Sequence, residues 1–74
     1  MYYVLLVDDE ENILQVLQDS IAWQDLGVEQ LFTAQSGEKA LELLEQNRID
    51  LLITDIQMPG MDGISLIKQV RSLN

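Results

Sequence analysis

Cysteine is absent from this chain of 74 residues, and so is histidine. Without cysteine the chain has no disulfides, thiolate metal sites or cysteine nucleophiles. Basic residues are scarce: there are four, against 13 acidic ones, which gives a formal net charge of −9. Because such a chain repels phosphate backbones and anionic lipid, we expect no direct binding to nucleic acid or to a membrane surface.

Long apolar runs are lacking as well. No segment approaches the roughly 20 apolar residues that span a bilayer. The apolar start, residues 1–7, is short, has no basic residues and runs directly into an acidic segment, unlike a signal peptide. With 47% hydrophobic residues, the composition is that of a globular protein. We therefore expect one small cytoplasmic domain.

Three short segments predict β-strands. Residues 2–7 form a continuous apolar run that two aspartates end, and residues 51–54 form another that Asp55 ends. Unbroken runs of this kind are typical of strands buried on both faces of a parallel sheet. Residues 30–34 are a weaker strand candidate.

Helical patterns separate these strands. Apolar residues recur at three- and four-residue spacing from Ile13 to Ile21, and Gly27 is a candidate end for that helix. A second helix is expected between Ser36, a candidate N-cap, and Asn47. Asp62 can cap a third helix. The apolar side of this third helix is expected to hold Ile64, Ile67 and Val70.

The resulting order, βαβαβα, is the pattern of an α/β fold with a parallel sheet. Ligands of such sheets bind beyond the carboxyl ends of the strands, where the strand order reverses. With strand order 2-1-3, Asp8, Asp9 and Asp55 meet at one edge, because neighbouring strands lie about 4.8 Å apart. Carboxylates that close resist ionising together unless a cation neutralises them.

A magnesium ion suits this arrangement, since two carboxylates and one backbone carbonyl suffice when the ion keeps several waters. Asp55 is then a candidate nucleophile that forms an aspartyl phosphate. The carbonyl is expected from the loop that follows, in which Pro59 fixes the backbone. Each element also has a simpler interpretation: the acids can cap helices, and Pro59-Gly60 can be a plain turn. Their combination favours phosphoryl chemistry.

The same segments resemble the receiver domains of two-component response regulators. Residues 4–10 are similar to the acidic-pair strand of that family, and residues 50–63 to its phosphoacceptor strand and loop. Residues 36–41 are similar to the start of its second helix. The resemblance covers the whole chain and implies a flavodoxin-like (receiver) fold.

The resemblance also implies a role for four residues. Asp55 would be the phosphoacceptor, Asp9 would ligate Mg²⁺ directly, and Asp8 would do so directly or through water. Gln57 would offer its backbone carbonyl to the metal. The phosphoryl donor would be a phosphohistidine on a sensor histidine kinase, and the receiver would catalyse this transfer to itself without being an enzyme for other substrates.

One further resemblance concerns the parent protein. Residues 21–23 and 26–27 are similar to receivers whose parents end in an AraC-type helix-turn-helix module. This implies transcription regulation, with DNA bound by a C-terminal domain. Alternatively, Trp23 is a packing residue at a helix end.

Receivers of this kind have five strands in the order 2-1-3-4-5, whereas this sequence ends at Asn74, in or just after the third helix. Residues 1–74 are therefore expected to be a partial receiver domain, with strands 1–3 and helices 1–3 only. The Ser/Thr and Lys that the fourth and fifth strands carry in the family have no counterpart. We expect impaired phosphotransfer and homo-oligomers formed through the exposed third strand, residues 51–54.

Two alternatives stay open. A phosphatase of the haloacid-dehalogenase type also uses an aspartate at a strand end, but its second aspartate would stand where this chain has Gln57. The other alternative is a self-associating structural fragment, in which the acids serve only as caps and solubilising charge.

Overall fold

The computed structural model describes residues 1–73 as a three-stranded parallel sheet with helices on both faces. The strands are β1 (Tyr2–Val7), β2 (Val28–Ala34) and β3 (Leu51–Thr54). The helices are α1 (Glu11–Ser20), a short 3-10 helix η1 (Trp23–Leu26), α2 (Gly37–Gln46) and α3 (Gly63–Leu73). The strand order is β2-β1-β3, so the predicted α/β architecture and the order 2-1-3 are confirmed.

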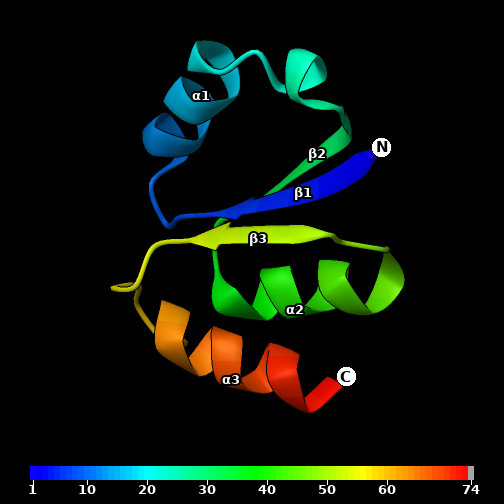
Figure 1. The fold of residues 1–74 in the computed structure, drawn as a ribbon. Helices are drawn as coiled ribbons and strands as arrows, with labels where there is room; N and C mark the ends of the chain where they lie inside the picture. Colours follow the sequence, from blue (N-terminus) through cyan, green and yellow to red (C-terminus); the bar gives the residue numbers. More distant parts are fainter. Residues whose placement is uncertain (74) are drawn as a thin grey trace.

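β1 is the central strand because it pairs with both of the others. Leu5 lies opposite Phe32 of β2 and Leu52 of β3. Successive side chains of a strand point to opposite faces, so Leu5 and Val7 pack against α2 and α3. Val4 and Leu6 pack toward α1 on the other face. Figure 1 shows these two layers, with α1 on one side of the sheet and α2 and α3 on the other.

The buried side of α3 differs from the predicted one. Leu66 is fully buried, whereas Ile64 and Ile67 are 51% and 44% exposed. Of the predicted set only Val70 packs against the core, four residues after Leu66 and on the same side of the helix. The prediction is therefore wrong for the two isoleucines.

The link between α1 and β2 contains η1, which the sequence pattern did not predict. Gly27, expected to end the first helix, ends η1 instead, with a left-handed φ of 86°. The indole N–H of Trp23 donates to the carbonyl oxygen of Leu17 at 3.1 Å and so ties η1 back to α1. Trp23 is thus a packing residue, as the simpler interpretation proposed, and β2 starts two residues before the predicted strand.

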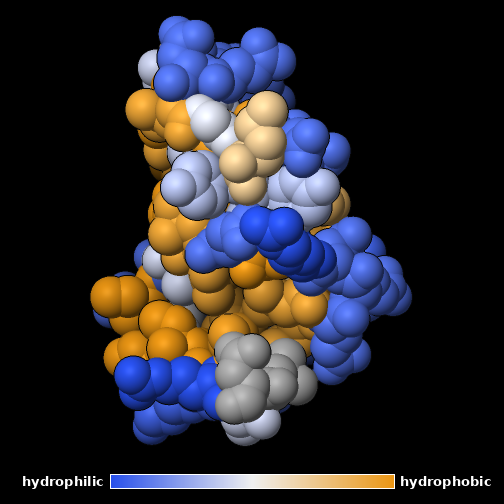
Figure 2. Space-filling view, turned by 45° about the vertical axis from the view of Figure 1, so that its right-hand side comes forward, coloured by the Kyte–Doolittle hydropathy of each residue, from blue (hydrophilic) through white to orange (hydrophobic). Residues whose placement is uncertain are grey.

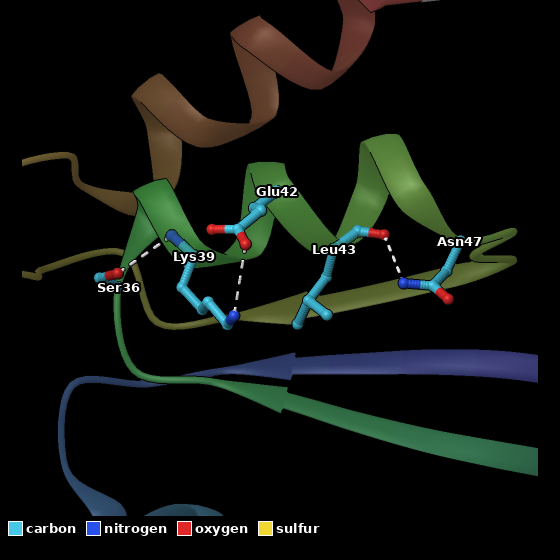
Figure 3. A network of polar contacts seen from close by, with 5 residues as sticks. All are labelled: Ser36, Lys39, Glu42, Leu43 and Asn47. Carbon is cyan, nitrogen blue, oxygen red and sulfur yellow. Dashed lines mark hydrogen bonds and ion pairs between the residues drawn. The ribbon is translucent and has the colours of Figure 1, made fainter.

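Both ends of α2 are closed by side chains, as predicted. The Ser36 hydroxyl oxygen accepts a hydrogen bond from the N–H of Lys39 at 3.1 Å (Figure 3). At the other end, the amide of Asn47 donates to the carbonyl oxygen of Leu43 at 3.0 Å. Lys39 also forms an ion pair with Glu42 at 3.6 Å, one turn along the exposed side.

The free edge of the sheet is apolar. Among the described residues, β3 pairs only with β1, and its side chains Leu51 and Ile53 are 51% and 40% exposed. Figure 2 shows hydrophobic residues reaching the surface across the middle of the molecule, between hydrophilic groups. None of the helices within residues 1–73 combines the length and apolar character required to cross a bilayer.

Candidate functional site

Aspartates directly follow two neighbouring strands and lie at the same edge of the sheet. The N–H of Asp8 donates to the carbonyl oxygen of Ala34 at 3.1 Å, and the N–H of Asp55 donates to that of Val7 at 3.0 Å. Sheet pairing thus continues one residue beyond β1 and β3. Because β1 and β3 are parallel neighbours, both aspartates leave the sheet at their shared carboxyl end.

The carboxylates of Asp8, Asp9 and Asp55 form a cluster, as the sequence predicted. Each offers an oxygen atom, and these atoms all lie within 4.8 Å of one another. Asp8 is partly buried, whereas the other two are exposed. Oxygens that share one Mg²⁺ lie at most about 4.2 Å apart, so small side-chain rotations complete the set. The donor atoms and their spacing fit a hard divalent cation.

The acids are not used as helix caps. Glu10 is the N-cap residue of α1, and its side chain makes no capping hydrogen bond. Asp8 Oδ1 accepts from the N–H of Glu10 at 3.0 Å, one residue before the helix. Within residues 1–73, the side chain of Asp9 has no hydrogen-bond partner. Both carboxylates are therefore available to a ligand.

Gln57 lies beside Asp55. Its N–H donates to Asp55 Oδ1 at 3.4 Å, a long and weak contact. Gln57 is exposed and lines the same cleft as the three aspartates. The role of its carbonyl as a metal ligand stays a prediction.

A cleft of about 560 Å³ surrounds the cluster. It is lined by Val7, Asp8, Asp9, Glu10, Ile13, Leu17, Ile53, Thr54, Asp55 and Gln57. Four of these residues are acidic and none is basic, so the cleft attracts cations. The same charge repels an anion such as a phosphoryl group unless a cation accompanies it.

Thr54 was not among the predicted site residues, although it lines the cleft. Its hydroxyl donates to the carbonyl oxygen of Asp55 at 3.0 Å. The sequence held one signal for it: Thr54 is the only polar residue of the strand 51–54.

Other aspartates near β3 have structural partners. The N–H of Ser65 donates to Asp62 Oδ1 at 2.8 Å and holds the pKa of that carboxyl below its ordinary value. Asp62 is thus the predicted cap of α3. At the opposite end of β3, the N–H of Tyr3 and the guanidinium of Arg48 lower the pKa of Asp50.

Comparisons with known proteins agree with this geometry. The family model of the response regulator receiver domain matches residues 4–74. The chain is 42% identical over 74 residues to the uncharacterized transcriptional regulatory protein YesN of Bacillus subtilis. It is also similar to a crystal structure of a two component transcriptional regulator AraC from Clostridium phytofermentans, with a TM-score of 0.93 at 33% identity over 99% of the chain.

A third similarity is to a chain in the crystal structure of histidine kinase ThkA in complex with response regulator protein TrrA. The TM-score is 0.86 at 36% identity, over all of the present chain. The chain spans 20% of the length of YesN and 59% and 61% of the two solved chains.

Proposed function

The chain belongs to the receiver-domain family of two-component response regulators, and from this premise we propose that Asp55 is its phosphoacceptor and that phosphorylation requires Mg²⁺. The observation that carries the proposal is the convergence of the carboxylate oxygens of Asp8, Asp9 and Asp55 within 4.8 Å. Structural neighbours are receiver domains, and the strand order β2-β1-β3 fits the flavodoxin-like fold that was expected.

In the proposed reaction, a carboxylate oxygen of Asp55 attacks the phosphorus of a phosphohistidine. The O–P bond forms, the N–P bond breaks, and the imidazole leaves and takes up a proton. Asp55 suits this role because its carboxylate is exposed and, among residues 1–73, accepts only the weak contact from Gln57. The chain catalyses a step on itself and is not proposed to act on other substrates.

Asp8 and Asp9 would hold Mg²⁺ together with Asp55 and the carbonyl of Gln57. When bound, the ion offsets the negative charge of the phosphoryl group during transfer. The residues of the chain supply the rest: the pairing of Asp55 with Val7 fixes the nucleophile, and Ile13, Leu17 and Ile53 form the apolar side of the cleft.

The proposed donor is a sensor histidine kinase. Support comes from a similar chain solved in complex with a histidine kinase. For the parent protein we propose transcription regulation, because similar proteins carry that description. DNA binding would fall to a domain outside these 74 residues, whose net charge of −9 opposes contact with phosphates.

We also propose that copies of this chain associate through β3. The supporting observation is its apolar edge, which pairs with no further strand within residues 1–73 and leaves Leu51 and Ile53 about half exposed. Edges of this type recruit further strands unless charge, proline or a bulge protects them. β2, by contrast, carries the exposed polar residues Glu29 and Gln30.

The test of phosphorylation uses acetyl phosphate and Mg²⁺, with intact-mass detection of one added phosphoryl group. The unaltered chain should gain it, and Asp55→Asn should not. Asp25→Asn is the matched control, because Asp25 lies in η1 among the residues at the opposite end of the sheet. Modification of Asp55→Asn to the same extent as the unaltered chain would overturn the proposal.

A further inference from the structure

The first residue of α3 lies directly against the backbone of Asp55. A Cβ atom placed on Gly63 would lie 2.2 Å from the carbonyl oxygen of Asp55 and 2.9 Å from the Cα atom of Ile56. Gly63 does not have a positive φ, unlike Gly27 and Gly60. A glycine is therefore needed at position 63 only because the backbone of Asp55 comes so close.

Several interactions keep the start of α3 close to the backbone of Asp55. The N–H of Gly63 donates to the carbonyl oxygen of Ile56 at 2.9 Å. The hydroxyl of Thr54 donates to the carbonyl oxygen of Asp55 at 3.0 Å. Further along α3, Leu66 is fully buried in the core and cannot move away without opening a cavity. The peptide that follows Asp55 is thus clamped between the end of β3 and the start of α3.

The side chain of Asp55 has no comparable support. It is exposed, and its only hydrogen bond among residues 1–73 is the 3.4 Å contact from the N–H of Gln57. The place of its carboxylate relative to Asp8 and Asp9 therefore depends on the backbone that carries it. A shift of that backbone therefore moves the carboxylate of Asp55 relative to Asp8 and Asp9 by a similar distance.

We infer that Gly63 is a positioning residue for the aspartate cluster: it lets α3 clamp the Asp55 peptide and so sets the carboxylate for metal binding and phosphoryl transfer. The inference rests on the proposed function. A methyl group at this position requires a backbone displacement of roughly 1 Å, and misplacement on that scale is enough to impair a preorganised site.

The experiment compares Gly63→Ala with Gly37→Ala in the 74-residue chain. Gly37 is the matched control: it is also buried and is the first residue of α2. Its added Cβ would meet the side chain of Met61, with the Cβ atom at 2.8 Å and the Sδ atom at 2.9 Å, whereas a Cβ on Gly63 would meet the backbone of Asp55 itself. Mg²⁺ affinity is measured by calorimetry, and beryllofluoride binding by the ¹⁹F signal of the folded protein.

Gly63→Ala should weaken Mg²⁺ binding roughly ten- to a hundredfold, the range typical of residues that orient metal ligands. Its ¹⁹F signal should shift or vanish. Gly37→Ala should melt at a lower temperature and bind Mg²⁺ like the unaltered chain. A merely structural role for Gly63 would lower the melting temperature of both variants and leave both affinities unchanged, which would overturn the inference.

Thr54 provides the second variant if Gly63→Ala does not fold. Thr54→Val removes the hydroxyl bond to Asp55 and should weaken Mg²⁺ binding, whereas Thr54→Ser keeps the hydroxyl and should restore it. Equal affinity in Thr54→Val and the unaltered chain would overturn the inference. If the unaltered chain binds neither Mg²⁺ nor beryllofluoride, the proposed function itself fails, and this result is distinct from a failure at Gly63 alone.

Discussion

The N–H of Asp55 donates to the carbonyl oxygen of Val7 at 3.0 Å, so the proposed nucleophile is paired with the residue directly before Asp8. This bond belongs to the sheet and does not depend on the flexible ends of side chains. It brings acids that are 47 positions apart in the sequence to one edge. The cluster therefore follows from the order β2-β1-β3.

Mutual repulsion within the cluster predicts that Asp9→Asn stabilises the metal-free chain, because Asp9 gives up no hydrogen bond in the described structure. The same variant should lose most of the stabilisation by Mg²⁺. For the unaltered chain, Mg²⁺ at about 100 times its Kd should add roughly 2.7 kcal/mol. Thermal melts with and without Mg²⁺ measure both effects. An Asp9→Asn variant that melts below the unaltered chain without metal and still gains the full Mg²⁺ shift would contradict the prediction.

Leu66→Ala should unfold the chain or nearly so. Leu66 is fully buried against the core, and its truncation costs about 2–5 kcal/mol. That is a large share of the stability of a small domain. Ile67→Ala, on the neighbouring residue, is the control and should cost under about 1 kcal/mol, because Ile67 is 44% exposed. Urea denaturation followed by circular dichroism measures the difference. Similar losses for the two variants would mean that α3 packs by another side.

Sequence patterns predicted the bounds of two strands but not the buried side of α3. β1 and β3 were predicted with their observed bounds because strands in such a sheet are continuous apolar runs. In α3, however, apolar residues occur on more than one side of the helix, so spacing alone did not single out Leu66. Burial depends on how α3 meets the sheet, which is a tertiary property.

The candidate site likewise contains residues that the sequence predicted and a contact that it did not. Asp8, Asp9 and Asp55 were predictable, because acids that end parallel strands converge once the strand order is known. The close approach of Gly63 to Asp55 was not, since a glycine beside a helix cap reads as part of a turn. η1 was missed because four residues are too few to show periodicity.

Acid should lower the stability of the fold, and part of this loss should come from protonation of Asp62. The pKa of Asp62 is lowered in the folded state by the N–H of Ser65, so the folded form binds this proton less readily than the unfolded form. The stabilisation is present above the pKa of the unfolded chain and is lost as the pH falls below about 4 and through the folded pKa. Asp62→Asn should keep the cap but reduce the change in the free energy of unfolding over this pH range. Urea denaturation between pH 2 and pH 6 (roughly the span of carboxyl titration) measures it. An unchanged slope in the variant would refute the assignment.

Association through β3 should respond to a charge on its exposed edge. The unaltered chain should sediment as a species larger than the monomer, and salt should favour it, because screening reduces repulsion between copies that each carry a net charge of −9. Ile53→Lys should restore the monomer, since a lysine on an edge strand opposes pairing with another strand. Val16→Lys is the control: Val16 is exposed on α1, outside the sheet, and its replacement should leave the association unchanged. A monomeric unaltered chain at micromolar concentration, or equal effects of the two lysines, would show that the edge of β3 is not the contact.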